Sequence, residues 1–298
     1  MVIMGTLIGA VLFYFAGSEA FPLIMSTPWW RVVLIMLLGF LMIPALISWD
    51  IRGWTETNPL NGPNWSLTYE YVANILYALV IRHFSKITLG VFVALSASLT
   101  LDLALNIDMF GLLEGRVREA YTVIGGWNIS PQQIYIALTR LLYPFFMGLL
   151  LSRVNRLVRV NRGFYVCSLL VIVFMVMPRI SGTESMWMNG VYDAVCILLV
   201  FPLIVSMGAG STVTGKRSVA VCRFFGEISY PIYITHYPLI YMQIAWVKSH
   251  PDAPLGTHVA VAVGVFLLSI GIAYAALKVY DIPVREWLRD HWLKSSSK

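Results

Sequence analysis

The stretch Gly62-Pro63-Asn64-Trp65-Ser66-Leu67-Thr68-Tyr69-Glu70-Tyr71-Val72-Ala73-Asn74-Ile75-Leu76-Tyr77 decides the fold, because a polar turn ends in it and an apolar helix begins. Residues i and i+4 share a helix face, so Ser66, Glu70 and Asn74 are predicted to align. Glu70 then lies about one turn inside a predicted membrane span. A carboxylate there is costly and normally faces a bundle interior or a wet cavity. We interpret Glu70 as a candidate functional acid; the alternatives are an interfacial acid or an interhelical salt bridge.

The composition around this stretch is that of a membrane protein. The chain has 298 residues, of which 58% are hydrophobic and 12% charged, whereas a soluble domain carries about 25% charged residues. Apolar runs of about 17–25 residues predict membrane helices. We predict an all-α, polytopic transmembrane helix bundle with about nine spans, the first of them short. The predicted spans are Val2–Phe15, Val32–Ile47, Leu67–Ile81, Leu89–Leu105, Gln133–Leu151, Phe164–Met177, Trp187–Ser206, Ile232–Val247 and His258–Leu277.

The net charge of +6 is distributed as a topology signal. Basic residues gather in every second loop, as the positive-inside rule requires, with Arg153, Arg156, Arg159 and Arg162 crowding one of them. This pattern predicts a lipid bilayer with anionic headgroups as partner, not nucleic acid. It also predicts a cytoplasmic C-terminus, and we expect the protein in a bacterial inner (plasma) membrane.

The domain organisation is predicted to be simple. Residues 1–279 form one transmembrane domain, and residues 280–298 form a cytoplasmic amphipathic tail, for which a frayed, solvated end is the alternative. The three cysteines have no metal-like spacing, so neither a metal site nor a disulfide framework is predicted.

A second informative stretch is Phe225-Gly226-Glu227-Ile228-Ser229-Tyr230-Pro231-Ile232-Tyr233-Ile234-Thr235-His236-Tyr237-Pro238. Ser229 is a plausible N-cap and Pro231 suits a first turn, so a helix is predicted to begin here. Its spacing places Ser229, Tyr233 and His236 on one face.

Pro238 is predicted to kink this helix, because it has no N–H for the carbonyl of Ile234 and so frees that acceptor. A polar stripe beside a kink is typical of a cavity wall. His236 could therefore act there as a base, an acid or a donor. The alternative is a histidine that only bonds across helices.

Arg140 is the third feature, because it lies inside a predicted span with Pro144 four residues later. A guanidinium at depth needs a partner. The candidate partners are Glu70, Asp193 and Asp102, or an anionic group of a substrate.

Together, Asn64-Trp65-Ser66-Leu67-Thr68-Tyr69-Glu70-Tyr71 and Gly226-Glu227-Ile228-Ser229-Tyr230-Pro231-Ile232-Tyr233-Ile234-Thr235-His236 resemble the acyltransferase-3 family. The resemblance covers roughly Met1 to Leu277. It implies a polytopic enzyme that transfers an acetyl or other short acyl group from acyl-CoA to a hydroxyl of an extracytoplasmic carbohydrate or glycan. It implies no tightly bound cofactor, with acyl-CoA as donor.

The resemblance also implies roles for residues. His236 and Glu70 are the implied catalytic acid–base pair, and Trp65, Ser66, Tyr69, Arg140, Ser229, Tyr230 and Tyr233 are the implied substrate-binding residues. The family's arginine followed eleven positions later by a histidine is absent, since no histidine here has an arginine at that spacing. We therefore expect that the chain lacks about two helices upstream of Met1.

Two other classes of protein stay open at this point. One is a transporter or flippase for a glycan or lipid intermediate, which buried charges and proline-broken helices also suit. The other is a non-catalytic remnant of the acyltransferase. Acyl-CoA-dependent product formation separates the enzyme from both.

Overall fold

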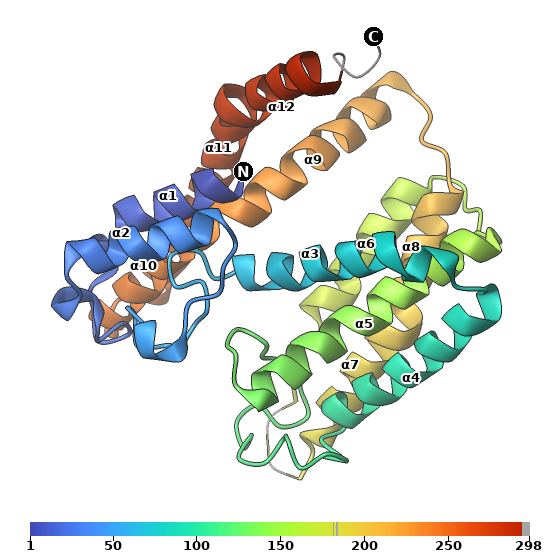
Figure 1. Ribbon diagram of the computed structural model, residues 1–298, viewed down its shortest axis with the longest axis horizontal. Coiled ribbons are helices and arrows are strands. Elements are labelled where there is room, and N and C mark those ends of the chain that lie inside the picture. The colour runs from blue at the N-terminus through green and yellow to red at the C-terminus, as the bar shows by residue number, and fades with distance from the viewer. Residues whose placement is uncertain (181, 183, 294–298) are drawn as a thin grey trace. The chain divides into compact units, whose positions relative to one another are not determined.

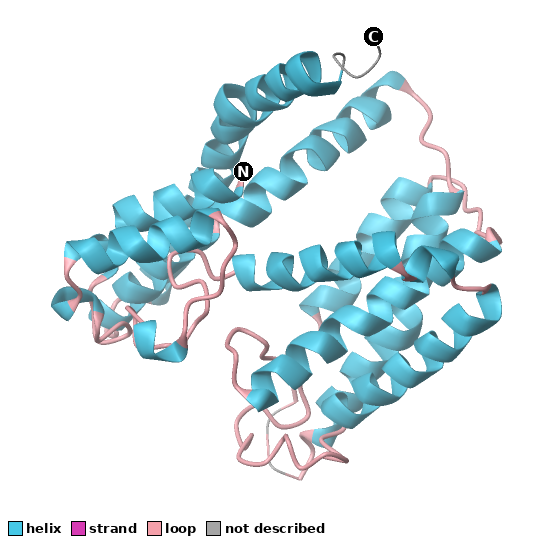
Figure 2. Cartoon of the chain, viewed as in Figure 1, coloured by secondary structure: helices cyan, strands magenta, loops and turns pink. Residues whose placement is uncertain are grey.

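The computed structural model describes residues 1–180, 182 and 184–293, and these form helices and loops with one isolated bridge between Ser18 and Phe21 (Figure 2). The predicted all-α class is confirmed. The α-helices are α1 Val2–Leu12, α2 Trp29–Phe40, α3 Asn64–Leu79, α4 Lys86–Ala104, α5 Pro131–Val154, α6 Gly163–Val176, α7 Trp187–Val195, α8 Phe201–Gly210, α9 Lys216–Thr235, α10 Tyr237–Ser249, α11 Leu255–Ala276 and α12 Ile282–Leu288 (Figure 1).

Contacts divide the chain into two compact units. The first unit comprises Met1–Thr68 and Val221–Lys298, and the second comprises Tyr69–Ala220. The boundaries fall inside α3 and α9, so each of these helices contributes to both units.

In the first unit, α1 packs against α2 and α10 (Figure 1). Their shared core includes Phe13, Ile24, Ile35, Leu60 and Tyr241, all of them buried. Leu60 belongs to the long loop between α2 and α3. Residues 56–63 of this loop are buried, so this part belongs to the core and does not lie on the surface as connecting segments usually do.

Two glycines let α1 approach this loop closely. A Cβ at Gly9 would lie 1.9 Å from the carbonyl oxygen of Leu60, and a Cβ at Gly5 would lie 2.3 Å from that of Ile234. The two glycines are four residues apart and so share one helix face. That face of α1 has to lack side chains so that the backbone of Leu60 and of Ile234 can pack against it.

The second unit is built on the pair of α4 and α5, which lie along each other (Figure 1). The side chains of Ser85 and Ser130 accept from backbone N–H groups in the first turns of these helices and cap them. α5 and α6 pack against α8, and α4 packs against α7. A π-helical turn, Cys196–Val200, joins α7 to α8 in one continuous run.

Two predicted helix boundaries are wrong. α2 ends at Phe40 rather than Ile47, because Met42 adopts a positive φ of 55° and Pro44 disfavours helical backbone at the residue before it. The helix predicted to start with Ser229 as N-cap begins at Lys216, so Pro231 lies inside α9 and not in its first turn. The first residues of α9 include Lys216 and Arg217, so a search for apolar runs did not include this part of the helix.

The predicted break at Pro238 is confirmed, since α9 ends at Thr235 and α10 begins at Tyr237. His236 is the residue between the two helices. The single predicted span Ile232–Val247 is thus replaced by two helices that meet at this histidine.

Nine membrane spans are not confirmed. Within the described part of the chain, four helical runs are long and apolar enough to cross a membrane, namely Lys86–Ala104, Pro131–Val154, Trp187–Gly210 and Leu255–His291. Three shorter apolar helices cover Val2–Ala16, Trp29–Phe40 and Gly163–Val176. The run Leu255–His291 crosses residue 280, and residues 294–298 of the predicted tail lie outside the described residues. The tail's division from the transmembrane domain stays a prediction.

Replacing Gly9 by alanine should destabilise the first unit, because the new Cβ would overlap the Leu60 carbonyl and force the loop to move. We expect a loss of about 1–3 kcal/mol, as for other overpacked cores. The measurement is the thermal unfolding midpoint of the purified protein in detergent.

Gly264→Ala is the matched control, because Gly264 lies in α11 of the same unit and a Cβ there would meet no atom within 4 Å. This variant should match the parent or melt slightly higher, because alanine favours a helix more than glycine does. Equal midpoints for both variants would refute the close packing of α1 on the loop.

Candidate functional site

Residues from the two informative stretches meet in the first unit. The hydroxyls of Ser66 and Tyr233 are hydrogen-bonded to each other, although they are 167 positions apart in the chain. Both are also within hydrogen-bonding distance of the Pro63 carbonyl oxygen, Ser66 at 3.1 Å and Tyr233 at 3.1 Å. The turn that opens α3 and the end of α9 therefore form one polar site.

His236 stands at the edge of this site, and its backbone contacts determine its tautomer. Its Nδ1 lies 2.9 Å from the carbonyl oxygen of Ile232 and 3.1 Å from that of Tyr233. A carbonyl oxygen only accepts, so Nδ1 carries the proton and the neutral ring has its lone pair on Nε2. Its ring centroid lies 6.4 Å from that of Tyr233. The half-buried imidazole is thus oriented to accept a proton at Nε2.

Asparagines that the sequence analysis did not single out hold this site together. Asn61 Nδ2 donates to the Ile234 carbonyl at 2.8 Å, which is the acceptor that Pro238 leaves free. Asn64 donates to the Thr6 hydroxyl of α1 at 3.2 Å. Their signal in the sequence was an asparagine at every third position, 58, 61 and 64. The Asn61 N–H donates to the Asn58 carbonyl, and the Asn64 N–H donates to the Asn61 carbonyl.

A buried cation lies behind the site and was also missed. Arg52 is only 1% exposed, and its guanidinium carbon is 3.8 Å from the ring centroid of Tyr241. The rings of Phe13 and Phe21 lie 5.1 and 5.2 Å away, and Arg52 Nε donates to the Pro59 carbonyl. Cation–π contacts of this kind gain strength where water is excluded. An arginine in a loop carries no sequence signal that it will be buried among aromatic rings.

Glu56 is the acid of this buried cluster. Its Oε2 accepts from the Tyr241 hydroxyl at 2.5 Å, and Glu56 itself is 7% exposed. Burial raises the pKa of Glu56 to about 7, while the Tyr241 hydrogen bond and the charge of Arg52 oppose that rise. Glu56 is therefore an acid that titrates near neutral pH.

The other predicted site residues of the first unit lie on the same two helices, α3 and α9. Ser229 and Tyr230 are exposed on α9, and the Ser229 hydroxyl donates to the Gly226 carbonyl of its own helix. Trp65 is half-buried in the first turn of α3. Of the predicted set, Ser66, Tyr233 and His236 are connected by the contacts described above.

Tyr69, Glu70 and Arg140 belong to the second unit. Glu70 is exposed and forms no ion pair within the described residues; its backbone carbonyl accepts from Asn74 Nδ2 at 2.9 Å. Arg140 donates to the Gly125 carbonyl. No ion pair between Arg140 and Glu70 is present in the part of the chain that the structure describes.

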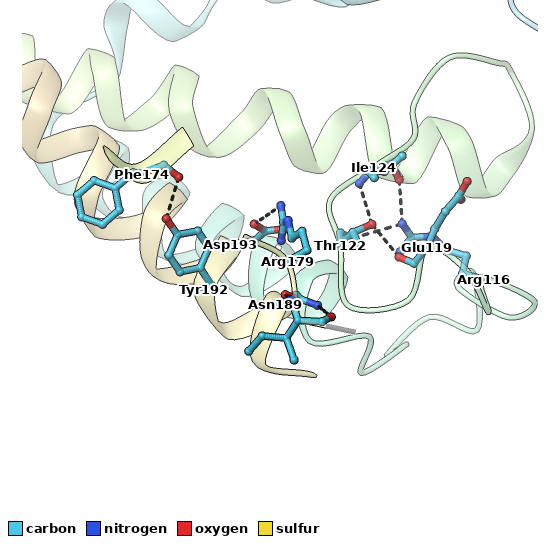
Figure 3. Close-up of polar contacts among 10 residues, drawn as sticks. Arg116, Glu119, Thr122, Ile124, Phe174, Arg179, Asn189, Tyr192 and Asp193 are labelled. Carbon is cyan, nitrogen blue, oxygen red and sulfur yellow. Dashed lines mark hydrogen bonds and ion pairs between the residues drawn. The ribbon is translucent and has the colours of Figure 1, made fainter. Parts of the chain in front are cut away.

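The other acids proposed as partners of Arg140 are engaged elsewhere. Asp193 pairs with Arg179 at 2.8 Å (Figure 3). Asp102 accepts from the Tyr135 hydroxyl at 2.5 Å and from the Met109 N–H at 2.8 Å. Arg140, Arg179 and Asp193 nevertheless line one cavity of about 560 Å³ inside the second unit. The described residues contain no group of three or more histidine, cysteine or acidic side chains placed to hold a metal.

The raised pKa of Glu56 makes a pH prediction for the first unit. Because that pKa lies above the model-peptide value of 4.5, the side chain adds stability below pH 4.5, and this stability is lost as the pH rises to about 7. The expected loss is on the order of 3 kcal/mol. We expect Glu56→Gln to remove this contribution, seen as a flatter dependence of the unfolding midpoint on pH from 4.5 to 7 than in the parent.

Glu19→Gln serves as its control, because Glu19 is an exposed acid of the same unit. This control should keep the parent's pH dependence. A Glu56→Gln profile that runs parallel to the parent's would contradict the raised pKa.

Comparison with known proteins identifies the family of the chain. A family model described as an acyltransferase domain matches residues 1–278, which include both stretches and the cavity-lining helices. No curated protein and no solved structure matches the chain. The family match covers nearly all of the 298 residues. Together with its long apolar helices, this match identifies the chain as an integral membrane protein that belongs to the acyltransferase-3 family.

Proposed function

We propose that the protein transfers an acetyl or other short acyl group from acyl-CoA to a hydroxyl of an extracytoplasmic carbohydrate or glycan intermediate. The observation that carries the proposal is the hydrogen-bonded pair of Ser66 and Tyr233 hydroxyls, with the His236 ring centroid 6.4 Å from that of Tyr233 and its Nδ1 2.9 Å from a backbone carbonyl oxygen. A base and hydroxyl donors are the groups that acyl transfer to an alcohol requires.

In this mechanism Nε2 of His236 takes the proton of the acceptor hydroxyl as its oxygen attacks the thioester carbonyl. The resulting tetrahedral oxyanion accepts hydrogen bonds from the hydroxyl pair of Ser66 and Tyr233. The pair has two protons, of which one can lie on the Pro63 carbonyl and one between the hydroxyls. Donation to the oxyanion therefore requires the second proton to leave the hydrogen bond between the hydroxyls. Collapse expels the CoA thiolate, which the imidazolium protonates, and the ester is released.

The remaining roles rest on the family resemblance. Glu70 is proposed as the acidic member of the catalytic pair. Trp65, Tyr69, Ser229 and Tyr230 are proposed to shape the acceptor and thioester sites, and Arg140 to hold an anionic group of a substrate. Acyl-CoA and the carbohydrate are substrates in this proposal, which needs no tightly bound cofactor.

The proposed location is a bacterial inner (plasma) membrane with a cytoplasmic C-terminus. Support comes from the clustering of arginines in the loop between α5 and α6, where Arg153, Arg156, Arg159 and Arg162 carry no neighbouring acid. This loop would face cytoplasmic acyl-CoA and attract its phosphates.

Replacing His236 by glutamine should lower acyl transfer by about 100- to 10,000-fold, because the general base is lost while the side chain keeps a similar size. Tyr233→Phe should lower it by about 10- to 100-fold, since one donor to the oxyanion disappears. The assay follows radiolabelled acetyl groups from acetyl-CoA into cell-envelope polysaccharide of the source organism, with the full chain in lipid nanodiscs.

His250→Gln is the matched control, because His250 Nδ1 lies 2.9 Å from the Trp246 carbonyl oxygen in the same intrahelical arrangement but outside the site. It should transfer acetyl groups at the parent rate. Full activity in His236→Gln would refute the proposed base. Absence of acetyl-CoA-dependent product, together with gradient-driven uptake of a glycan intermediate, would favour the transporter over the enzyme.

A further inference from the structure

Two adjoining pockets lie in the second unit at the beginning of α6. Their volumes are about 480 and 440 Å³, and they adjoin because Phe164 and Val213 belong to the walls of both. The first lies between α6, the loop that follows α8 and the first turn of α9. The second lies between α6 and α8, which pack against each other (Figure 1). Both volumes are within the range of ligand sites in proteins.

The first pocket, which we call the polar pocket, has a cation and several hydroxyl groups in its wall. Arg162 contributes a guanidinium, and the hydroxyl-bearing residues are Tyr165, Thr212, Thr214 and Ser218. The hydroxyls of Tyr165 and Ser218 lie 2.9 Å apart and so connect α6 with α9. A guanidinium beside hydroxyl donors suits the several acceptor oxygens of a phosphate.

The second pocket, which we call the apolar groove, continues from the polar pocket along α6 and α8. Its wall includes Phe164, Val171, Ile172 and Val213, and none of the described residues in this wall is charged. From Phe164 to Ile172 the backbone of α6 rises by about 12 Å. The groove therefore offers an elongated apolar surface that begins next to Arg162.

The surface around the polar pocket is cationic. Arg162 lines the pocket, and Lys216 and Arg217 open α9 directly before Ser218 of its wall. The segments 154–180 and 194–220, which form the walls of both pockets, contain no aspartate or glutamate. Among the residues that the structure describes, none of these three cations forms an ion pair. This charge distribution is complementary to an anion.

The loop that carries Arg162 is held in place by the end of α8. The Ser211 hydroxyl donates to the Val160 carbonyl at 3.1 Å and accepts from the Val160 N–H at 3.2 Å. Gly163 allows the close approach that follows, because a Cβ there would lie 2.3 Å from Ser211 Cβ. Arg162 lies between these two fixed points, so its backbone position at the pocket is set by the fold.

We propose that the polar pocket and the apolar groove together bind an anionic phospholipid, with its phosphate at Arg162 and an acyl chain along α6 and α8. A soluble anion such as CoA would use the polar pocket and leave the groove without a partner, whereas a phospholipid fills both. A zwitterionic phospholipid carries an ammonium group beside its phosphate, which Lys216 and Arg217 would repel. The ligand is therefore a lipid whose head group has a net negative charge, such as phosphatidylglycerol.

The test uses the purified full chain in neutral detergent and two fluorescent phospholipids with identical acyl chains, phosphatidylglycerol and phosphatidylcholine. We expect phosphatidylglycerol to bind about tenfold more tightly, because it lacks the ammonium group that the cations repel. Arg162→Gln should reduce this preference about fivefold, which is the contribution of one cation near an anionic head group. Arg162→Lys should retain the preference, because the positive charge is kept.

Gly208→Leu tests the apolar groove. Gly208 lines the groove, and the nearest atom to a Cβ there would be Cys167 Sγ at 3.9 Å, so the new side chain fills the groove without a clash. This variant should lose most of its binding of both lipids, because the acyl chain no longer fits beside α6.

Two matched variants control for general effects of charge and of glycine replacement. Arg118→Gln removes a cation from an exposed position of the same unit outside both pockets, and Gly90→Leu replaces a glycine of α4 that also has open space at its Cβ. Both should bind the lipids as the parent does. Equal affinity of the parent for the two head groups, or a loss of preference in Arg118→Gln as large as that in Arg162→Gln, would overturn the proposal. Unchanged binding in Gly208→Leu would do the same.

Competition with CoA separates the lipid from a soluble phosphate compound. Displacement of the fluorescent phosphatidylglycerol by the unlabelled lipid, but not by CoA at the same concentration, supports the proposal. Displacement by CoA as effective as that by the unlabelled lipid assigns the polar pocket to a soluble anion and overturns it. The assay measures no acyl transfer, so its result is independent of whether the acyl-transfer assay succeeds.

Discussion

The candidate site depends on one hydrogen bond, from the side-chain amide of Asn61 to the carbonyl of Ile234 at 2.8 Å. Pro238 leaves this carbonyl without its helical partner, and a buried unpaired carbonyl costs as much as a lost hydrogen bond. Asn61 supplies the missing donor from the loop before α3. The loop is thereby tied to the break at which His236 stands. Gly5 makes the connection possible, since a Cβ there would lie 2.6 Å from Asn61 Nδ2.

The same loop carries a buried cation into the core of the first unit. Arg52 lies against the rings of Phe13, Phe21 and Tyr241, and Tyr241 in turn donates to Glu56. Removing a cation from water is costly, and the aromatic faces and the nearby carboxylate offset that cost. Tyr241 belongs to α10, which starts directly after His236. The cluster therefore stabilises the loop that leads into α3, which carries Ser66, and the helix that follows His236.

The two units carry different kinds of chemistry. The first has neutral donors and an imidazole around Pro63, and the second has arginines around an apolar cavity. The chain belongs to the acyltransferase-3 family, and the first kind is the one on which the proposed acyl transfer draws.

The sequence by itself determined the all-helical class, the family and the helix break at Pro238, because hydropathy, motif residues and a missing N–H are local properties. It also predicted Ser66, Tyr233 and His236 as site residues, and their functional role stays a prediction. It mispredicted the end of α2, because hydropathy does not reveal the positive φ at Met42. It also mispredicted the start of α9, because the first turn of that helix is charged and a search for apolar runs omits it.

Only the tertiary structure decided which polar groups meet. It paired Ser66 with Tyr233, gave Asp193 to Arg179 rather than to Arg140, and buried Arg52 and Glu56 together. These pairings join residues far apart in the chain, and a spacing rule reaches only a few turns along one helix. Contacts across helices depend on how closely the backbones approach. In the first unit that approach is set by the bare faces of Gly5 and Gly9, which no periodicity in the sequence distinguishes from ordinary helix positions.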